Sequence, residues 1–400
     1  MDDFWYSPVS GPSSAGLAVS EDSSLQCSAV WACVSIIARA VGALPFHLYE
    51  RTGERSHTPA TSHALYGLLH DQANFLMTAQ VFRETLTQHV LLWGNGYAYI
   101  DWTSRGTPRA LWPLRPDMVE PRLENGRLLY RCTFSSGDYS SMNFRNMIPI
   151  PGQKGFQADL DPADVLHIPG MGFNGITGYS VIGKMRNVIG LAMAAENYAA
   201  RLFANDARPS VVIEHPGVLK KDARDNLGKS WRANYGGSDK AGGTAVLEEG
   251  MKVKEVGFPP KDALWIESRK FSVIEICRWF HVPPHMVAEL ERSTNNNIEH
   301  QGIEFVVHTL MPWLVRWEQG TGLRLISQTG RYFAKLNVSG LLRGSIKDRT
   351  DAYRAFVDMG ALNPNEVREL EDWNPYDGGD EYRRQVNTQP VGAVGGGKNE

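Results

Sequence analysis

The sequence predicts an α+β protein in which long helices are combined with groups of short strands. Apolar residues recur at helical spacing over residues 178–205 and 268–280. Short runs rich in branched and aromatic residues lie between Gly, Pro and Asn-Gly turns, which is typical of strands. A content of 42% hydrophobic and 21% charged residues is that of an ordinary globular protein.

The chain begins with a segment that we expect to be mobile. Residues 7–24 are rich in Ser, Gly and Pro, so residues 1–24 are assigned to a flexible N-terminal arm. Residues 28–42 then predict a helix with one apolar face, which carries Val30, Cys33, Ile37 and Val41. Pro45 ends this helix, and Phe46–Tyr49 predicts a strand.

A second helix and a group of strands follow. Residues 78–93 predict the helix, which ends at the turn Gly94-Asn95-Gly96. The strands are separated by turns and cover residues 97–102, 110–113, 128–134 and 165–168.

The longest helical pattern, residues 178–205, has a stripe of small residues in its middle. Val181, Met185 and Leu202 continue the stripe toward the two ends. Small side chains allow neighbouring helices to approach closely. We therefore predict that the following residues pack against other helices: Val188, Ala192, Ala195 and Ala199.

A small α/β unit is predicted between the two long helices. Residues 211–213 predict a strand, residues 221–235 a helix, and residues 244–247 a second strand. The helix at 268–280 then returns from this unit. Two long helices that flank a small unit predict a stalk with a head.

A polar loop and another long helix come next. Pro283 and Pro284 cannot continue the preceding helix. Residues 297–318 predict a helix with a kink at Pro312, because this proline leaves the carbonyl of His308 without its helical donor.

The chain ends with a predicted helix pair, residues 348–359 and 364–371. Gly360 suits the end of the first helix. Asn363 and Glu366 suit the capping box of the second. Residues 385–400 are Gly-rich and are expected to be disordered.

The charge and cysteine content exclude some functions. A net charge of −3 does not fit a protein built to hold DNA, which needs a basic excess, although DNA could pass without being held. The four cysteines form no Cys-x-x-Cys pair and are expected to be reduced. Eleven Trp and 14 Tyr suit packed interfaces as well as cores.

Two glycine-rich patterns in residues 170–184 suggest nucleotide binding, but both lack the required context. Gly170–Gly175 matches Gly-x-Gly-x-x-Gly, yet the helix is predicted to start near Tyr179, beyond the glycines. Gly178–Met185 resembles a phosphate-binding loop, yet Met185 stands where a Ser or Thr would bind Mg²⁺. A nucleotide-binding enzyme that uses this segment remains the alternative function.

Metal and catalytic sites are not expected. His300, Glu304 and His308 lie four residues apart on one helix and are the strongest metal candidate, but no Cys joins them. His281 and His285 flank the two prolines and therefore lack helical spacing. No Gly-x-Ser-x-Gly motif occurs. We predict no catalytic residues, no cofactor and no metal.

Motifs spread along the chain resemble those of one family. They are Ser28–Ala38 with Leu44-Pro45, Leu91-Leu92-Trp93-Gly94-Asn95-Gly96-Tyr97, Val165–Ile168 with Gly178-Tyr179-Ser180, Val246–Met251, Phe280-His281-Val282-Pro283-Pro284, Pro312-Trp313 and Gly360–Arg368. In this order they resemble the portal proteins of tailed bacteriophages, the ring-shaped head–tail connectors. The match runs from about residue 25 to about residue 380. One departure is His70–Asn74, where the family usually has Pro before Asn.

The resemblance implies an elongated protomer with wing, stem, clip and crown parts. The implied boundaries are 25–177 for the first part of the wing, 178–207 and 267–283 for the stem helices, 208–266 for the clip, 284–297 for the tunnel loop, 298–344 for the second part of the wing and 345–384 for the crown.

The resemblance also implies a ring of twelve copies at one capsid vertex, a channel for DNA packaging and ejection. The loop expected in the channel contains Glu289, Leu290, Glu291, Arg292, Ser293, Thr294, Asn295 and Asn296. The clip residues expected to face the packaging motor are Lys220, Lys221, Arg224, Lys229 and Arg232.

Partners follow from the same resemblance. They are further copies of the chain, the large terminase subunit, the major capsid or scaffold protein, a head–tail adaptor, and double-stranded DNA that passes without sequence specificity. The expected location is the virion, after synthesis in the host cytoplasm, with no membrane association.

Overall fold

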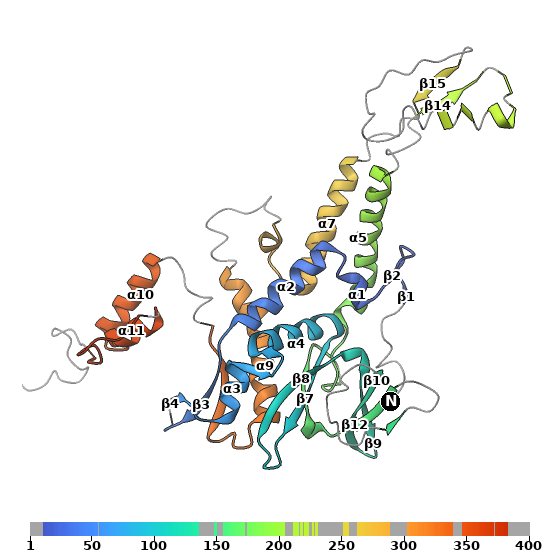
Figure 1. Cartoon of the computed structure of the whole chain (residues 1–400). Coiled ribbons are helices and arrows are strands. Elements are labelled where there is room, and N and C mark those ends of the chain that lie inside the picture. Colours follow the sequence, from blue (N-terminus) through green and yellow to red (C-terminus); the bar gives the residue numbers. More distant parts are fainter. Residues whose placement is uncertain are drawn as a thin grey trace, which may run out of the picture. The chain divides into compact units, whose positions relative to one another are not determined.

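A computed structural model shows an α+β chain built from helices and several small antiparallel sheets (Figure 1). It describes residues 11–54, 56–135, 148–149, 155–172, 174–204, 211–215, 217–218, 220–223, 226–227, 229–230, 251–255, 262–288, 302–338, 346–371 and 373–382. The chain divides into two compact units, Met1–Asn337 and Val338–Glu400. Within the described residues, no helix has the length and apolar character needed to cross a membrane.

Two helices form the centre of the first unit. These are α2 (Ser28–Ala43) and α4 (Ala79–Trp93), which pack against each other. All four residues of the predicted apolar face of α2 are buried. The predicted strand follows as β3 (Phe46–Arg51). Gly94 ends α4 in the left-handed conformation, with φ of 77°, as the turn pattern indicated.

Arg83 on α4 joins the ends of two other helices to this centre. It is buried and donates to the carbonyl oxygens of Leu69, Gly42 and Leu44 at 2.6, 2.8 and 2.9 Å. These carbonyls lie at the C-terminal ends of α3 (Ala64–His70) and α2, where a cation is favourable. Burial lowers the pKa of Arg83 to about 10, so it remains charged at neutral pH.

Two antiparallel sheets share one core. The first has the order β13-β7-β8, with β7 (Asn95–Trp102), β8 (Pro108–Leu114) and β13 (Val165–Pro169). The second has the order β11-β12-β10-β9, with β9 (Val119–Glu124), β10 (Arg127–Ser135), β11 (Ile148–Pro149) and β12 (Gly155–Leu160). Short 3₁₀ turns, η2 (Pro116–Met118) and η3 (Pro162–Asp164), lead into β9 and β13. The buried side chains of both sheets form one cluster that includes Tyr97, Tyr130 and Val165.

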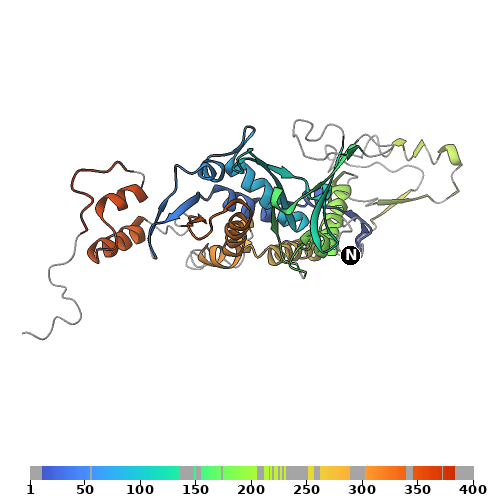
Figure 2. The same cartoon turned by 90° about the horizontal axis from the view of Figure 1, so that it is seen from below.

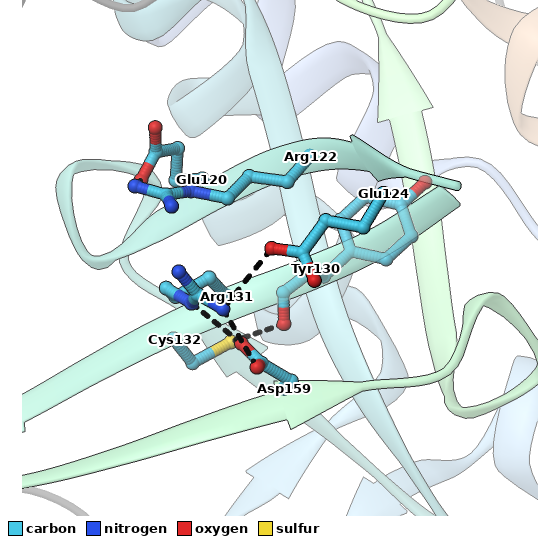
Figure 3. Close-up of polar contacts among 7 residues, drawn as sticks. All are labelled: Glu120, Arg122, Glu124, Tyr130, Arg131, Cys132 and Asp159. Atoms are coloured by element: carbon cyan, nitrogen blue, oxygen red, sulfur yellow. Dashed lines mark hydrogen bonds and ion pairs between the residues drawn. The ribbon is translucent and has the colours of Figure 1, made fainter. Parts of the chain in front are cut away.

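Strand β10 shows how alternation divides inner from outer residues. Tyr130 and Cys132 are buried, whereas Arg131 between them contacts Asp159 on β12 at 2.7 Å and Glu124 on β9 at 3.2 Å (Figure 3). Opposite charges that face each other across neighbouring strands stabilise the pairing of those strands.

A third sheet, β16-β3-β4, pairs strands from the early and late parts of the sequence of the first unit. Its strands are β16 (Tyr332–Leu336), β3 and β4 (His57–Pro59). The sequence analysis did not predict β9, β12 or β16. Their alternation is short and interrupted by charged residues. Strands β12 and β16 pair with β10 and β3, which are more distant in the sequence, whereas β9 forms a hairpin with β10 across Asn125-Gly126. A small hairpin, β5 (Gln72–Asn74) with β6 (Met77–Thr78), precedes α4.

The helix that contains Pro312 differs from the prediction. It continues past residue 318 as α9 (Met311–Leu325), and a π-helix, η6 (Phe305–Leu310), lies directly before it. The irregularity therefore precedes Pro312. A π-helix closes its hydrogen bonds one residue later than an α-helix and so changes which donors need partners.

The predicted long helices lie side by side as α5 (Val181–Ala204) and α7 (Asp262–Phe280), green and gold in Figure 1. Helix α5 starts later and α7 earlier than predicted. Helix α7 ends before the double proline, and η5 (Pro284–Val287) follows. Strand β14 (Val211–Glu214) pairs antiparallel with β15 (Lys252–Glu255). The strand predicted at 244–247 lies outside the described residues, as does part of the helix predicted at 221–235.

Part of the arm predicted to be mobile is folded. Residues 11–24 contain β1 (Gly11–Pro12), β2 (Ala18–Val19) and α1 (Glu21–Ser24), and β2 and α1 contact α5. Val19 and Ser24 are buried. The Ser- and Gly-rich composition concealed this because, besides Val19, polar residues attach the hairpin to the helix: the amide of Ser14 donates to Asn187 Oδ1 at 3.0 Å, and Ser13 is buried.

The second unit contains a helix pair, α10 (Ile346–Asp358) and α11 (Pro364–Leu370), red in Figures 1 and 2. The capping box predicted at Asn363 and Glu366 is formed, and Gly360 has φ of 72°. Arg349 on α10 reaches Glu371 after α11 at 3.2 Å. The tail at 385–400 lies outside the described residues.

Candidate functional site

The glycine-rich stretch 170–184 forms a packing joint at the start of α5. The amide of Gly170 donates to the carbonyl oxygen of Gly94 at 2.8 Å. A Cβ on Gly178 would lie 2.1 Å from that same Gly94 oxygen, and one on Gly172 would lie 1.9 Å from the carbonyl oxygen of Thr177. These glycines are therefore needed because segments of backbone meet here, not because a nucleotide approaches.

Asn95 fastens this joint through its side-chain amide. Its Oδ1 accepts from the amide of Gly178 at 2.8 Å, and its Nδ2 donates to the carbonyl oxygen of Gly178 at 3.0 Å. Because backbone groups are the partners, the orientation of the amide is fixed. Asn95, the first residue of β7, thus holds Gly178, which lies three residues before α5.

His167 connects the joint to the core of the two sheets. Its Nε2 lies 3.1 Å from Asn95 Oδ1, and its Nδ1 lies 3.1 Å from the hydroxyl of Tyr130. An amide oxygen only accepts, so Nε2 carries the proton and Nδ1 accepts from Tyr130. Burial, together with the charge of Arg324, lowers the pKa of His167 to about 3. The neutral imidazole is therefore a fixed structural link.

The N-terminus of α5 is occupied by side chains of the chain itself. Ser180 Oγ accepts from the amide of Gly183 at 3.0 Å. It also lies 3.0 Å from Glu21 Oε1 and 2.9 Å from the carbonyl oxygen of Leu92. Burial raises the pKa of Glu21. This arrangement caps the helix and places a carboxyl group where a phosphate-binding helix would hold its ligand.

Lys184 points to a neighbouring ring. Its Nζ lies 4.3 Å from the centre of the Tyr179 ring, a cation–π contact. Gly170, Gly172, Gly178, Ser180 and Lys184 therefore each have a structural contact within the chain. The geometry does not support the alternative of a nucleotide-binding enzyme.

The metal candidate is not assembled by the described residues. Among them, no group of three or more His, Cys, Asp or Glu side chains could hold a metal ion. His300 lies outside the described residues, and the π-helix starts between Glu304 and His308, which removes the α-helical spacing. His281 and His285 lie on the turn after α7.

The predicted packing stripe of α5 is only partly internal. Ala192 is buried, Val188 and Ala195 are half-buried, and Ala199 lies in a helical part whose side chains are not described. The buried face instead carries Ile182, Met185, Ile189 and Ala192. Packing between α5 and α7, and between α5 and α4, turns the helix in this way. Whether the half-buried residues contact another copy stays a prediction.

The cysteines are free and buried, as expected of reduced thiols. The Sγ atoms of Cys33 on α2 and Cys277 on α7 lie 3.9 Å apart. They form a packing contact that attaches α7 to the centre of the first unit.

The residues predicted to lie in the channel, Glu289–Asn296, are outside the described residues. Of the clip residues, Lys220, Lys221 and Lys229 are exposed, whereas Arg224 and Arg232 are also outside them. The roles of both sets therefore stay predictions.

Sequence reasoning missed the joint residues Asn95, Tyr130 and His167. Asn95 was interpreted as part of a turn, and His167 as an ordinary strand residue. Two features of the sequence could have pointed to these residues. They are the motif Gly94-Asn95-Gly96 and the cluster of glycines before α5. Only the fold shows that these two sets of residues meet.

Comparisons of the sequence with a family model and with known proteins point to the same family. The family model described as phage portal protein matches residues 28–372. The portal protein of Enterobacteria phage HK97 is 32% identical over 386 residues, covering 95% of this chain and 86% of that protein. The probable portal protein of Streptomyces phage phiC31 is 32% identical over 388 residues, covering 94% and 82%.

A solved structure has the same fold. The chain aligns with a protein in the neck of a native gene transfer agent particle, computed with C12 symmetry, at a TM-score of 0.58 and 22% identity. The alignment covers 89% of this chain and 94% of that one. The phage portal protein family is a structural, non-enzymatic component of the capsid. Together, the motifs, the fold and the near-complete sequence matches show that the chain belongs to the phage portal protein family.

Proposed function

We propose that twelve copies of this chain form a closed ring at one vertex of the capsid, through which DNA enters during packaging and leaves during ejection. The observation that carries this proposal is the match to the portal family over residues 28–372. The C12 symmetry of the related neck supports the number of copies. A head-to-tail interface that repeats around an axis closes into such a ring.

The proposed role in DNA transport is passive. The joint at the start of α5 is filled by the chain's own backbone and side chains, which argues against one candidate nucleotide site. From the family resemblance, we assign the energy for translocation to a separate ATPase, the large terminase subunit. A net charge of −3 suits a conduit, since a strongly basic lining would retain DNA through counterion release.

The proposed division of labour follows the family pattern. Helices α5 and α7 are the stem, and the segment between them is the clip that contacts terminase. Exposed Lys220, Lys221 and Lys229 supply positive charge for that contact. The residues around α9 belong to the wing, α10 and α11 to the crown, and residues 284–297 to the channel loop. A capsid or scaffold protein and a head–tail adaptor are the further partners.

Measurement of the assembled mass tests the ring. Twelve chains of 44.5 kDa give a mass of roughly 530 kDa. Light scattering and electron microscopy of the purified protein, alone and with its scaffold or capsid protein, are expected to show rings of this mass. A chain that stays monomeric at micromolar concentration under both conditions would contradict the proposal.

A further inference from the structure

The helix that runs from residue 302 through η6 and α9 is apolar on its outer face as well as its inner face. Four large apolar residues are exposed on it: Ile303, Val307, Met311 and Val315, with 52, 49, 39 and 38% exposure. We call these residues the outer stripe. They are spaced four residues apart. A helix that is apolar all round is normally buried on all sides.

The inner face of the same helix is already buried within the first unit. Val306, Leu310, Leu314 and Trp317 are buried. Trp317 donates from Nε1 to the hydroxyl of Thr87 on α4 at 3.1 Å, which anchors the helix to the centre of the first unit. The outer stripe therefore cannot become buried by rotation of the helix.

The π-helix explains how the outer stripe stays on one side. In a regular α-helix, residues four apart are displaced by about 40° around the axis, so the step from 303 to 315 would turn the stripe by about 120°. The π-helix η6 covers 305–310, where bonds close one residue later and each residue turns less. The π segment thus reduces the drift and keeps the four side chains aligned. Irregular turns of this kind are frequent at functional sites.

We propose that the outer stripe is the surface through which each subunit packs against the next copy of this chain. The inference rests on the proposed ring and identifies a face of its interface. Interfaces in permanent assemblies resemble a protein core cut in half, with few charges at their centre. The outer stripe has that character. The charged or titratable side chains exposed beside it between 302 and 315 are Glu304 and His308.

DNA is a poorer occupant for the same face. Binding of a phosphate backbone needs Lys or Arg, and residues 302–315 contain neither. The next cation, Arg316, lies over the ring of Trp313 at 4.9 Å and donates to the carbonyl oxygen of Pro312 at 3.2 Å. Its guanidinium is thus engaged within its own helix.

The test introduces charge into the outer stripe. The double variant Val307→Glu/Met311→Glu is expected to need at least tenfold more protein to assemble, since burial of two unpaired carboxylates opposes association. The control is Leu323→Glu, because Leu323 lies on α9 outside the stripe and is 73% exposed. Light scattering across a concentration series measures assembly. Thermal unfolding is expected to be nearly unchanged in both variants because the sites are exposed.

A crosslinking measurement identifies the occupant directly. Benzoylphenylalanine replaces Val307, and ¹⁴N- and ¹⁵N-labelled chains are mixed before assembly and illumination. Adducts between light and heavy chains are expected. Adducts only within one chain, or to DNA in filled particles, overturn the inference.

The outcomes also separate this inference from the proposed function. Rings formed by the wild type and equally by the charged double variant overturn the interface but leave the ring intact. A wild type that never assembles overturns both.

Discussion

Asn95 holds together three parts of the chain that are far apart in the sequence: the start of β7, His167 on β13 and Gly178 shortly before α5. It is buried, and its amide oxygen accepts from both Gly178 and His167. Removal of such a group leaves buried polar atoms without partners, which costs more than the hydrogen bonds themselves contributed.

We therefore expect Asn95→Leu to destabilise the monomer by about 1–3 kcal/mol, since Gly178 and His167 would each lose a partner. Urea unfolding measures the change. Gln80→Leu makes the same chemical replacement at an exposed position of α4 and is expected to change stability by less than about 0.5 kcal/mol. Equal effects of the two substitutions would show that the joint carries no special stability.

His167 predicts a loss of stability in mild acid. In the folded chain its pKa is lowered to about 3, and that of half-buried His89 to about 4, whereas the reference value is 6.5. Below pH 6.5 the unfolded chain therefore binds more protons than the folded one, so stability falls as the pH decreases from 6.5 toward 4. Each histidine contributes up to about 1.4 kcal/mol per pH unit.

Urea unfolding at several pH values checks this dependence. His167→Gln is expected to be less stable at neutral pH but to lose less stability on acidification. His57→Gln, at an exposed residue of β4, is expected to keep the full slope. An unchanged slope in His167→Gln would mean that His167 takes up a proton in the folded chain near its ordinary pKa.

At the scale of elements, the joint decides where and in which direction α5 begins. Gly94, Gly170 and Gly178 bring the end of α4, the end of β13 and the start of α5 within backbone contact. Ser180 then caps α5. The direction of the proposed stem helix relative to the sheets thus depends on backbone contact rather than on a flexible linker.

Gly178→Ala is expected to disturb this contact. The added methyl group would lie 2.1 Å from the Gly94 oxygen and 2.7 Å from the Gly170 amide, and backbone atoms cannot move aside cheaply. We expect a loss of about 1–3 kcal/mol or more. Gly322→Ala on α9 meets no atom within 4 Å and is expected to be neutral or stabilising by up to about 1 kcal/mol. Thermal unfolding compares the two, and a fully stable Gly178→Ala would contradict the joint.

At the scale of the whole molecule, the proposed ring predicts that residues 284–297, which include η5, face the channel. Residues 284–297 connect α7 to the helix that carries the outer stripe, and Glu289 and Glu291 are opposed in charge only by Arg292. If this segment faces the channel, its charge acts on DNA within the Debye length of about 8–10 Å.

We therefore expect Glu289→Lys/Glu291→Lys to leave ring assembly intact but to impair DNA packaging or retention in a salt-dependent way, because the lysines attract the phosphate backbone. Glu289→Gln/Glu291→Gln removes the negative charge without adding positive charge and is expected to have a smaller effect. Packaged DNA per particle and infectivity measure the outcome. Normal packaging by the lysine variant would remove this loop from the mechanism.

The elements that depend on local chemistry could be predicted from the order of the amino acids alone. Helix α2 follows from its apolar face, the end of α4 from Gly94, and the start of α11 from the Asn363–Glu366 capping box. These predictions succeeded because each depends on residues within a few positions of one another. The family could also be identified from the sequence, because different family motifs follow one another in the expected order along most of the chain.

Features that depend on contacts between distant parts of the chain could be recognised only in the folded structure. Strand β16 exists because it pairs with β3, and the buried face of α5 is set by α4 and α7 rather than by its small residues. From the sequence alone, the glycines of residues 170–184 are compatible with nucleotide binding. Only the three-dimensional structure shows that Gly94 packs against them. The π-helix before Pro312 is likewise visible only in the three-dimensional structure, where the same helix is attached to α4 through the hydrogen bond from Trp317 to Thr87.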